Sequence, residues 1–183
     1  MWLLAAVLLL SLISISADAA NYKFNMSYIY FGNSSAYTTL VDTTQNSLSE
    51  VAPNYFTLNS NGSLVVTNAV SQSFVNDMHS QGIRVVPYLT NDWGNQIGIN
   101  ALNNRDALSE SIVNAVATYN LDGVNIDIEN LNENQRAIYV DFIRLLRAKL
   151  PVEKTIAVAV AANPYNNSTG WSASYDYALL AQH

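Results

Sequence analysis

The chain of 183 residues is long enough to bury a hydrophobic core, since half of its residues are apolar and only 12% are charged. This composition is unlike that of a disordered chain. The formal net charge of −6 and the lack of a basic cluster argue against nucleic acid as a partner. Because the chain has no cysteine, a disulfide framework and a cysteine-based metal site are excluded.

The first 20 residues, MWLLAAVLLLSLISISADAA, have the form of a secretory signal peptide. An apolar run leads to small residues and to the Ala-x-Ala pattern of a signal-peptidase site. The run is shorter than the roughly 20 residues of a membrane span, so stable membrane insertion is not expected. One feature of a signal peptide is missing, since no Lys or Arg precedes the run. The alternatives are an uncleaved anchor and an amphipathic artefact. We expect cleavage after Ala19 or Ala20, secretion to the extracellular space or cell wall, and a folded part over residues 21–183.

Predicted strands and helices alternate along this part of the chain. Runs of β-branched and aromatic residues predict strands, whereas apolar residues three or four positions apart predict helices. The predicted strands are 26–32, 54–58, 83–91, 121–130 and 155–164, with a short returning strand at 63–66. The predicted helices are 70–78, 108–119 and 138–146. Pro87 argues against a regular third strand, because proline lacks the amide donor of the ladder.

Alternation of strands and helices at intervals of roughly 35 residues predicts βα units and a parallel sheet. The candidate architectures are a closed (β/α)8 TIM barrel and an open doubly wound sheet. No Gly-x-Gly-x-x-Gly follows the first strand, which removes the main support for the open sheet. We therefore predict an α/β fold of the barrel type. A complete barrel takes about 250 residues, so we expect only the first five βα units, with two open apolar edges prone to aggregation.

Polar and apolar residues alternate in the fourth predicted strand, LDGVNIDIEN. Since successive side chains of a strand point to opposite faces, Asn125, Asp127 and Glu129 point into the barrel and the apolar residues between them face the helices. Two carboxylates about 6–7 Å apart along one strand repel each other, so one of them is expected to keep its proton. Glu129 at the rim then suits a general acid. On spacing alone, a divalent-metal site and a structural polar ladder are alternatives. Zinc is not expected, because His79 lies elsewhere, on a predicted helix.

The segment DGVNIDIE resembles the Asp-x-x-Asp-x-Asp-x-Glu signature of glycoside hydrolase family 18. Asp122, Asp127 and Glu129 match this signature, and Asn125 stands where the family has its second Asp. The segments YIYFG, RVVPYLTN, TIAVAVAANP and GWSASYDYALLAQH are similar to strands one, three and five and to the approach to strand six in one bacterial branch. That branch includes the spore-cortex N-acetylglucosaminidases. The resemblance covers most of the chain and implies the same (β/α)8 barrel.

The resemblance implies hydrolysis of a β-1,4 bond after N-acetylglucosamine in peptidoglycan, with retention and without cofactor or metal. The 2-acetamido oxygen of the substrate would attack C1. Glu129 would protonate the leaving oxygen, Asp127 would orient the acetamido group, and Asp122 would be structural. Asn125 cannot share a proton with Asp127, but its amide can donate a hydrogen bond to it. The tyrosine that the family places on strand six would lie beyond His183.

Active sites of barrels lie at the carboxyl ends of the strands. The candidate sugar contacts near those ends are Tyr30, Asn91, Trp93, Asn130, Asn163 and Tyr165. Ordinary packing or loop capping is an equal alternative for each of them. A chitinase and a lectin-like protein without catalysis are the competing functions, although lectin-like members typically lose the acid that is Glu129 here. The expected partner is thus an N-acetylglucosamine-containing polysaccharide, and no oligomeric state follows from the sequence.

Overall fold

The computed structural model describes residues 23–30, 32 and 34–183, so the predicted signal peptide, residues 1–20, lies outside the described residues. The strands are β1 (Met26–Ile29), β2 (Glu50–Pro53), β3 (Phe56–Leu58), β4 (Leu64–Val66), β5 (Arg84–Val85), β6 (Tyr88–Thr90), β7 (Gly123–Asp127) and β8 (Thr155–Val158). The α-helices are α1 (Ser34–Asp42), α2 (Gln72–Ser80), α3 (Asn95–Asn103), α4 (Arg105–Thr118), α5 (Arg136–Lys149) and α6 (Tyr177–Leu180). The short 3-10 helices are η1 (Glu133–Gln135) and η2 (Trp171–Ser174). No helix in this described part is both long and apolar enough to cross a membrane.

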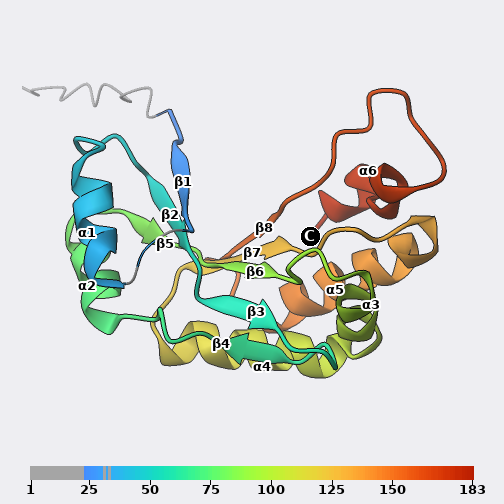
Figure 1. Ribbon diagram of the computed structural model, residues 1–183, viewed down its shortest axis with the longest axis horizontal. Helices are drawn as coiled ribbons and strands as arrows, with labels where there is room; N and C mark the ends of the chain where they lie inside the picture. The colour runs from blue at the N-terminus through green and yellow to red at the C-terminus, as the bar shows by residue number, and fades with distance from the viewer. Residues whose placement is uncertain (1–22, 31, 33) are drawn as a thin grey trace, which may run out of the picture.

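The strands form two sheets, and the chain passes between them more than once. The smaller sheet has the order β1-β2-β5 and the larger has the order β4-β3-β6-β7-β8. All pairs are parallel except the β3–β4 hairpin. In Figure 1, α1 and α2 lie beside the smaller sheet, and α4 lies against β4. The alternation of parallel strands and helices confirms the predicted βα units.

One predicted strand is broken into two short strands, another is preceded by a short strand that was not predicted, and proline lies at both junctions. The predicted strand 83–91 is β5 and β6, separated by Val86 and Pro87. The predicted strand 54–58 contains β3, and the strand before it, β2, which ends at Pro53, was not predicted. Because proline has no amide to donate, the ladder is interrupted at these points. The chain therefore bends there, and each segment joins the smaller sheet with its first half and the larger sheet with its second half.

Helices α1 and α3 were not predicted from the sequence. Among the described side chains of α1 only Tyr37 and Val41 are buried, so the apolar stripe is too sparse to stand out. In α3 a glycine and three asparagines lower the intrinsic helix propensity. Tertiary packing compensates in α3, since Ala101 and Leu102 are fully buried in the core. Gly98 of the same helix lets it lie against the segment that follows β7.

The apolar face of β7 is buried as predicted. Val124, Ile126 and Ile128 are fully inaccessible to solvent and belong to one core cluster with residues of α4 and α5. The fifth predicted strand is less well covered than β7. The four residues of β8 are only half-buried and Val160 beyond them is exposed. In the described part of the chain β8 pairs with β7 alone, which makes it an edge strand.

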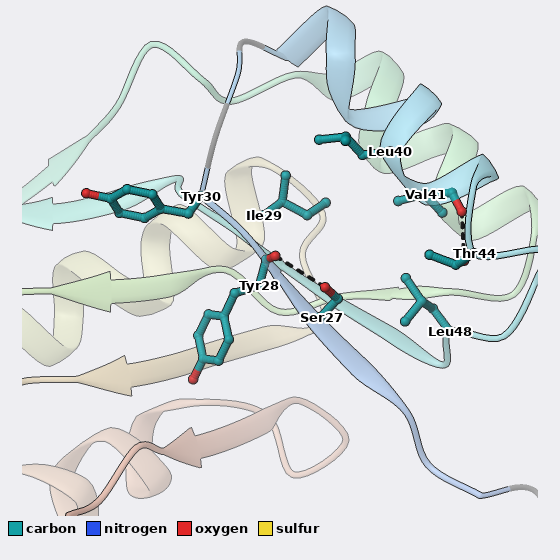
Figure 2. Close-up of a pocket in the computed structure, with 8 residues that line it drawn as sticks. All are labelled: Ser27, Tyr28, Ile29, Tyr30, Leu40, Val41, Thr44 and Leu48. Atoms are coloured by element: carbon teal, nitrogen blue, oxygen red, sulfur yellow. Dashed lines mark hydrogen bonds between the residues drawn. The ribbon is translucent and has the colours of Figure 1, made fainter.

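The sequence predicted two open apolar edges, and an apolar groove lies beside each of the edge strands β1 and β8. A cavity of about 270 Å³ lies between β1 and α1, and Figure 2 shows Ile29, Leu40, Val41 and Leu48 around it. A second groove of about 320 Å³ runs along β8 and is lined mostly by aliphatic residues. Exposed apolar edges of this kind promote association of strands.

The start of β7 depends on a glycine, which gives a first prediction. A Cβ atom on Gly123 would lie 2.1 Å from the carbonyl oxygen of Thr155, its partner on β8. We expect Gly123→Ala to lower the free energy of unfolding by about 3 kcal/mol, because neither backbone can move without breaking the ladder. Urea unfolding of the full-length protein measures this loss. Gly82→Ala is the control, since Gly82 also has positive φ but has open space around it. Equal losses in the two variants would contradict the argument.

Candidate active site

The polar residues of β7 point into the space between the two sheets. Asn125 donates a hydrogen bond through Nδ2 to the hydroxyl of Tyr28 on β1, at 3.1 Å. Since β1 belongs to the other sheet, this bond shows that both side chains lie on the inner face. Asn125 is 4% exposed, whereas Asp127 and Glu129 are half-buried. The predicted alternation is thus confirmed: the Asn125 amide is buried, and the carboxyl groups of Asp127 and Glu129, which follow it along the strand, are accessible to solvent.

Both carboxyl groups titrate above their ordinary range. Burial raises the pKa of Asp127 above 3.8. Burial also raises the pKa of Glu129 above 4.5, and the negative charge of Asp127 raises it further. Removal from water, rather than repulsion between the two acids, is therefore the larger cause. A carboxyl group that keeps its proton toward neutral pH is what a general acid requires.

Asn91 holds the backbone of Glu129, a role that the sequence did not indicate. The Asn91 side chain donates to the Glu129 carbonyl at 2.9 Å and accepts from the Glu129 amide at 2.9 Å. It also donates to the carbonyl of Gly94 at 3.0 Å, and it is 1% exposed. Both N–H donors and the Oδ1 atom of Asn91 thus bond to backbone groups, so the structure shows Asn91 as a support of Glu129.

Trp93 is presented at the rim by an unusual backbone. Its φ is +65° and that of the preceding Asp92 is +47°, values that cost conformational energy for residues other than glycine. Asn130 donates to the Trp93 carbonyl at 2.8 Å and Thr57 donates to Asp92 at 3.1 Å, which fixes the loop. The indole is 53% exposed. The Asn130 side chain therefore bonds to the backbone of the loop, while the Trp93 side chain remains exposed to solvent.

Trp171, which sequence reasoning missed, completes an aromatic pair with Trp93. The two ring centres are 5.2 Å apart at an angle of 67°, and Trp171 is 42% exposed. The amide of Gly170 donates to Glu133 at 2.7 Å, which attaches this segment to η1. No local sequence pattern predicts this pair, because the two tryptophans are far apart in the sequence.

The remaining predicted sugar contacts lie in two different settings. Tyr30 is 59% exposed and stacks on Tyr88, with ring centres 6.4 Å apart. Asn163 instead closes its own loop, since it donates to the carbonyl of Asn167 at 3.0 Å and accepts from its amide at 2.8 Å. Tyr165 lies in that loop and is 86% exposed. No contact among the described residues joins Asn163 or Tyr165 to the two carboxyl groups.

Asp122 lies at the opposite end of β7 and takes part in the scaffold. Its Oδ2 atom accepts from the amide of Val85 at 2.8 Å and lies 2.7 Å from Nε2 of His79. These contacts tie α2 and β5 to the start of β7. They also account for His79, which belongs to this scaffold and not to the site at the rim.

Two tyrosines of the inner face, Tyr28 and Tyr88, were not predicted as site residues. The sequence led us to expect that Asn125 donates to Asp127, but its amide donates to Tyr28 instead. Tyr88 is the register partner of Asn125 on β6 and is 3% exposed. The rings of Tyr28 and Tyr88 meet edge to face at 5.6 Å. Tyr28 precedes Tyr30 by two residues, so the period of two in the first strand was the signal available for it.

The fold is similar to several solved bacterial structures. The spore cortex-lytic enzyme SleL of Bacillus cereus matches with a TM-score of 0.73 and 18% identity, over 86% of this chain and 39% of that chain. A chitinase of Chromobacterium violaceum ATCC 12472 matches with a TM-score of 0.70 and 17% identity, over 86% of this chain and 52% of that chain. A chitinase of Bacteroides thetaiotaomicron matches with a TM-score of 0.64 and 20% identity, over 85% and 52% of the respective chains. A search of curated protein sequences found no match.

These matches confirm the predicted barrel class, and this chain spans between 39% and 52% of the three solved chains. The sequence profile described as glycosyl hydrolases family 18 matches residues 26–183, which include every described strand and helix. The profile thus extends over the strand that carries Asp127 and Glu129. The chain therefore belongs to glycosyl hydrolases family 18, and its five βα units are a part of the (β/α)8 barrel.

Proposed function

We propose that the protein is a secreted glycoside hydrolase that cleaves β-1,4 bonds after N-acetylglucosamine in peptidoglycan. The observation that carries this proposal is the position of Glu129. Its backbone is held by Asn91, its side chain is half-buried at the rim, and its pKa is raised by burial and by Asp127. The proposed secretion rests on the signal peptide predicted from the sequence.

The reaction proposed here proceeds by substrate assistance with retention of configuration. The 2-acetamido oxygen of the substrate attacks C1, and the protonated carboxyl of Glu129 gives its proton to the leaving oxygen. The resulting Glu129 carboxylate then activates water, which opens the oxazolinium intermediate. Ionised Asp127 orients the acetamido group and stabilises the positive charge that develops on it. Neither step needs a metal ion or a protein nucleophile.

Peptidoglycan is preferred over chitin on the strength of the segments that resemble the spore-cortex branch. Chitin oligomers are the second candidate, because solved structures of similar fold include chitinases. Purified cell wall or cortex fragments and chitin oligomers of matched length, assayed in parallel for new reducing ends, decide between them. Release from the wall fragments alone is the expected result, and release from chitin alone would assign the chain to the chitinases.

Replacing the proposed acid tests catalysis directly. We expect Glu129→Gln in the full-length protein to lower kcat by about 10²- to 10⁴-fold, because the amide has no proton to give at the rim. The release of reducing ends measures this loss. Glu110→Gln on the exposed surface of α4 is the matched control and should leave kcat unchanged. Unchanged turnover in Glu129→Gln would remove Glu129 from the mechanism. Sugar binding without turnover in the unmodified protein would favour the lectin-like alternative.

The pKa of Glu129 should depend on its neighbour. Asp127→Asn removes a negative charge that raises the pKa of Glu129, so Glu129 should lose its proton at lower pH. Since burial is the larger cause, the pKa should remain above the ordinary value of 4.5. Carboxyl ¹³C chemical shifts followed over a pH titration report the midpoint without requiring activity. An upward shift of the midpoint would contradict this electrostatic account.

The support that Asn91 gives to Glu129 should be visible in kinetics. Asn91→Leu keeps the approximate volume but leaves the amide and carbonyl of Glu129 without their partners. We expect a loss of about 2–3 kcal/mol in the free energy of unfolding, typical of buried groups left unsatisfied. We also expect a fall in kcat larger than the change in KM. Asn130→Leu, which removes a bond to the Trp93 carbonyl, is the control for general damage to the rim. A variant with normal kcat would show that Glu129 needs no such support.

A further inference from the structure

A cavity of about 280 Å³ lies beside the candidate active site, between the start of α5, the loop after β8 and the start of α6. In Figure 1, α6 lies beside α5. The walls of the cavity include Arg136, Asn166, Asp176 and Tyr177. Tyr175 also lines it, is 1% exposed, and donates through its hydroxyl to the carbonyl of Ile128 at 3.3 Å. Because Ile128 stands between Asp127 and Glu129, the cavity adjoins the end of β7 that carries the two carboxyl groups.

Arg136 is the only Lys or Arg residue near the carboxyl ends of the strands. It is the first residue of α5, the helix that follows β7. The chain has eight Lys and Arg residues, and the structure describes all of them. Of the other seven, three lie at or before the amino end of a strand, two are paired with Asp141, and two belong to the last turn of α5. In that order they are Lys23, Arg84 and Lys154, then Arg105 and Arg144, then Arg147 and Lys149.

The guanidinium of Arg136 is fixed in place but incompletely paired. Its Nε atom donates to the carbonyl of Ala173 at 2.7 Å, and the side chain is half-buried. No ion pair joins it to an acid among the described residues, and its Nη groups have no partner there. Asp176, the acid of the same cavity, instead accepts from the amide of Leu179 at 3.1 Å as the N-cap of α6. A half-buried guanidinium without a carboxylate partner favours an anionic ligand, because its planar donors match a carboxylate.

The two candidate substrates differ in their charge. Peptidoglycan contains N-acetylmuramic acid, whose lactyl ether carries a carboxyl group that is either free or extended by a peptide with carboxylates of its own. Chitin consists of neutral N-acetylglucosamine. Since the chain has a net charge of −6, most of its surface repels an acidic polymer. A fixed cation beside the site therefore has a ligand in peptidoglycan and none in chitin.

We propose that Arg136 binds a carboxylate of the muramyl unit and thereby selects peptidoglycan over chitin. The two Nη groups donate to the two carboxylate oxygens, while Nε keeps its bond to Ala173. The inference rests on the proposed function, whose substrate it makes more specific. Arg136 is then a specificity-determining residue that holds the substrate before and during the reaction. Its loss should raise KM for wall fragments and leave kcat nearly unchanged.

Two monosaccharides test this contact without any hydrolysis. N-acetylmuramic acid and N-acetylglucosamine differ only in the lactyl group, so NMR titration of the full-length protein with each isolates the effect of the carboxylate. We expect N-acetylmuramic acid to bind about tenfold more tightly, and this difference to shrink at high salt. Arg136→Gln should abolish the difference. Arg144→Gln is the matched control, because Arg144 is exposed on the same helix and pairs with Asp141, and it should leave the difference in place.

Muramyl dipeptide shows which carboxylate is bound. Its lactyl carboxyl is an amide and its free carboxylate lies on the peptide. Tighter binding of this compound than of N-acetylmuramic acid assigns Arg136 to the peptide carboxylate, and weaker binding assigns it to the lactyl group. Either preference supports the proposal if it disappears in Arg136→Gln.

A variant of the opposite sign guards against damage to the fold. Asp176→Asn removes a negative charge from the cavity and keeps a side chain that can cap α6. The affinity for N-acetylmuramic acid should therefore rise by about two- to fivefold, a gain that damage cannot produce.

Equal affinity of the unmodified protein for the two monosaccharides, binding of neither, or an unchanged difference in Arg136→Gln would overturn the proposal. A fall in affinity in Asp176→Asn would overturn it as well. Failure of the proposed function has another signature, since the unmodified protein would then release no reducing ends from wall fragments. The sugar titrations test Arg136 in either case.

Discussion

The two hydrogen bonds between the Asn91 side chain and the backbone of Glu129 are the contact on which the rim depends. They join the end of β6 to the residues after β7, where regular pairing has already stopped. The loop beyond Asn91 can therefore carry two consecutive residues at positive φ without unravelling. One buried amide thus positions both the carboxyl group of the proposed acid and the exposed ring of Trp93.

Burial without positive charge determines the chemistry of the inner face. Asp127 and Glu129 are surrounded by tyrosines from four different parts of the chain, and these rings remove water without supplying a cation. The cost of ionisation then falls on the two carboxyl groups, whose pKa values rise. An arginine in their place would have held both acids ionised and removed the proton donor.

The bends at Pro53 and Pro87 bring distant parts of the chain to this face. At each bend a strand of the smaller sheet, β2 or β5, ends and a strand of the larger sheet, β3 or β6, follows it. Tyr28 on β1 thereby comes within hydrogen-bonding distance of Asn125 on β7, although these strands are not neighbours in a sheet. The same curvature leaves β1 and β8 as open edges, each with an apolar groove beside it.

The sequence by itself determined the βα order, the inward row of Asn125, Asp127 and Glu129, and the burial of the apolar residues between them. These follow from a period of two in one strand, which is a local property. Only the tertiary structure decided which residues form hydrogen bonds or ring contacts with this site. The Asn125 amide bonds to Tyr28, Asn91 supports Glu129, and Trp171 meets Trp93, because folding joins segments that no sequence spacing relates. Helices α1 and α3 escaped prediction for the same reason, since long-range packing stabilises them more than their own residues do.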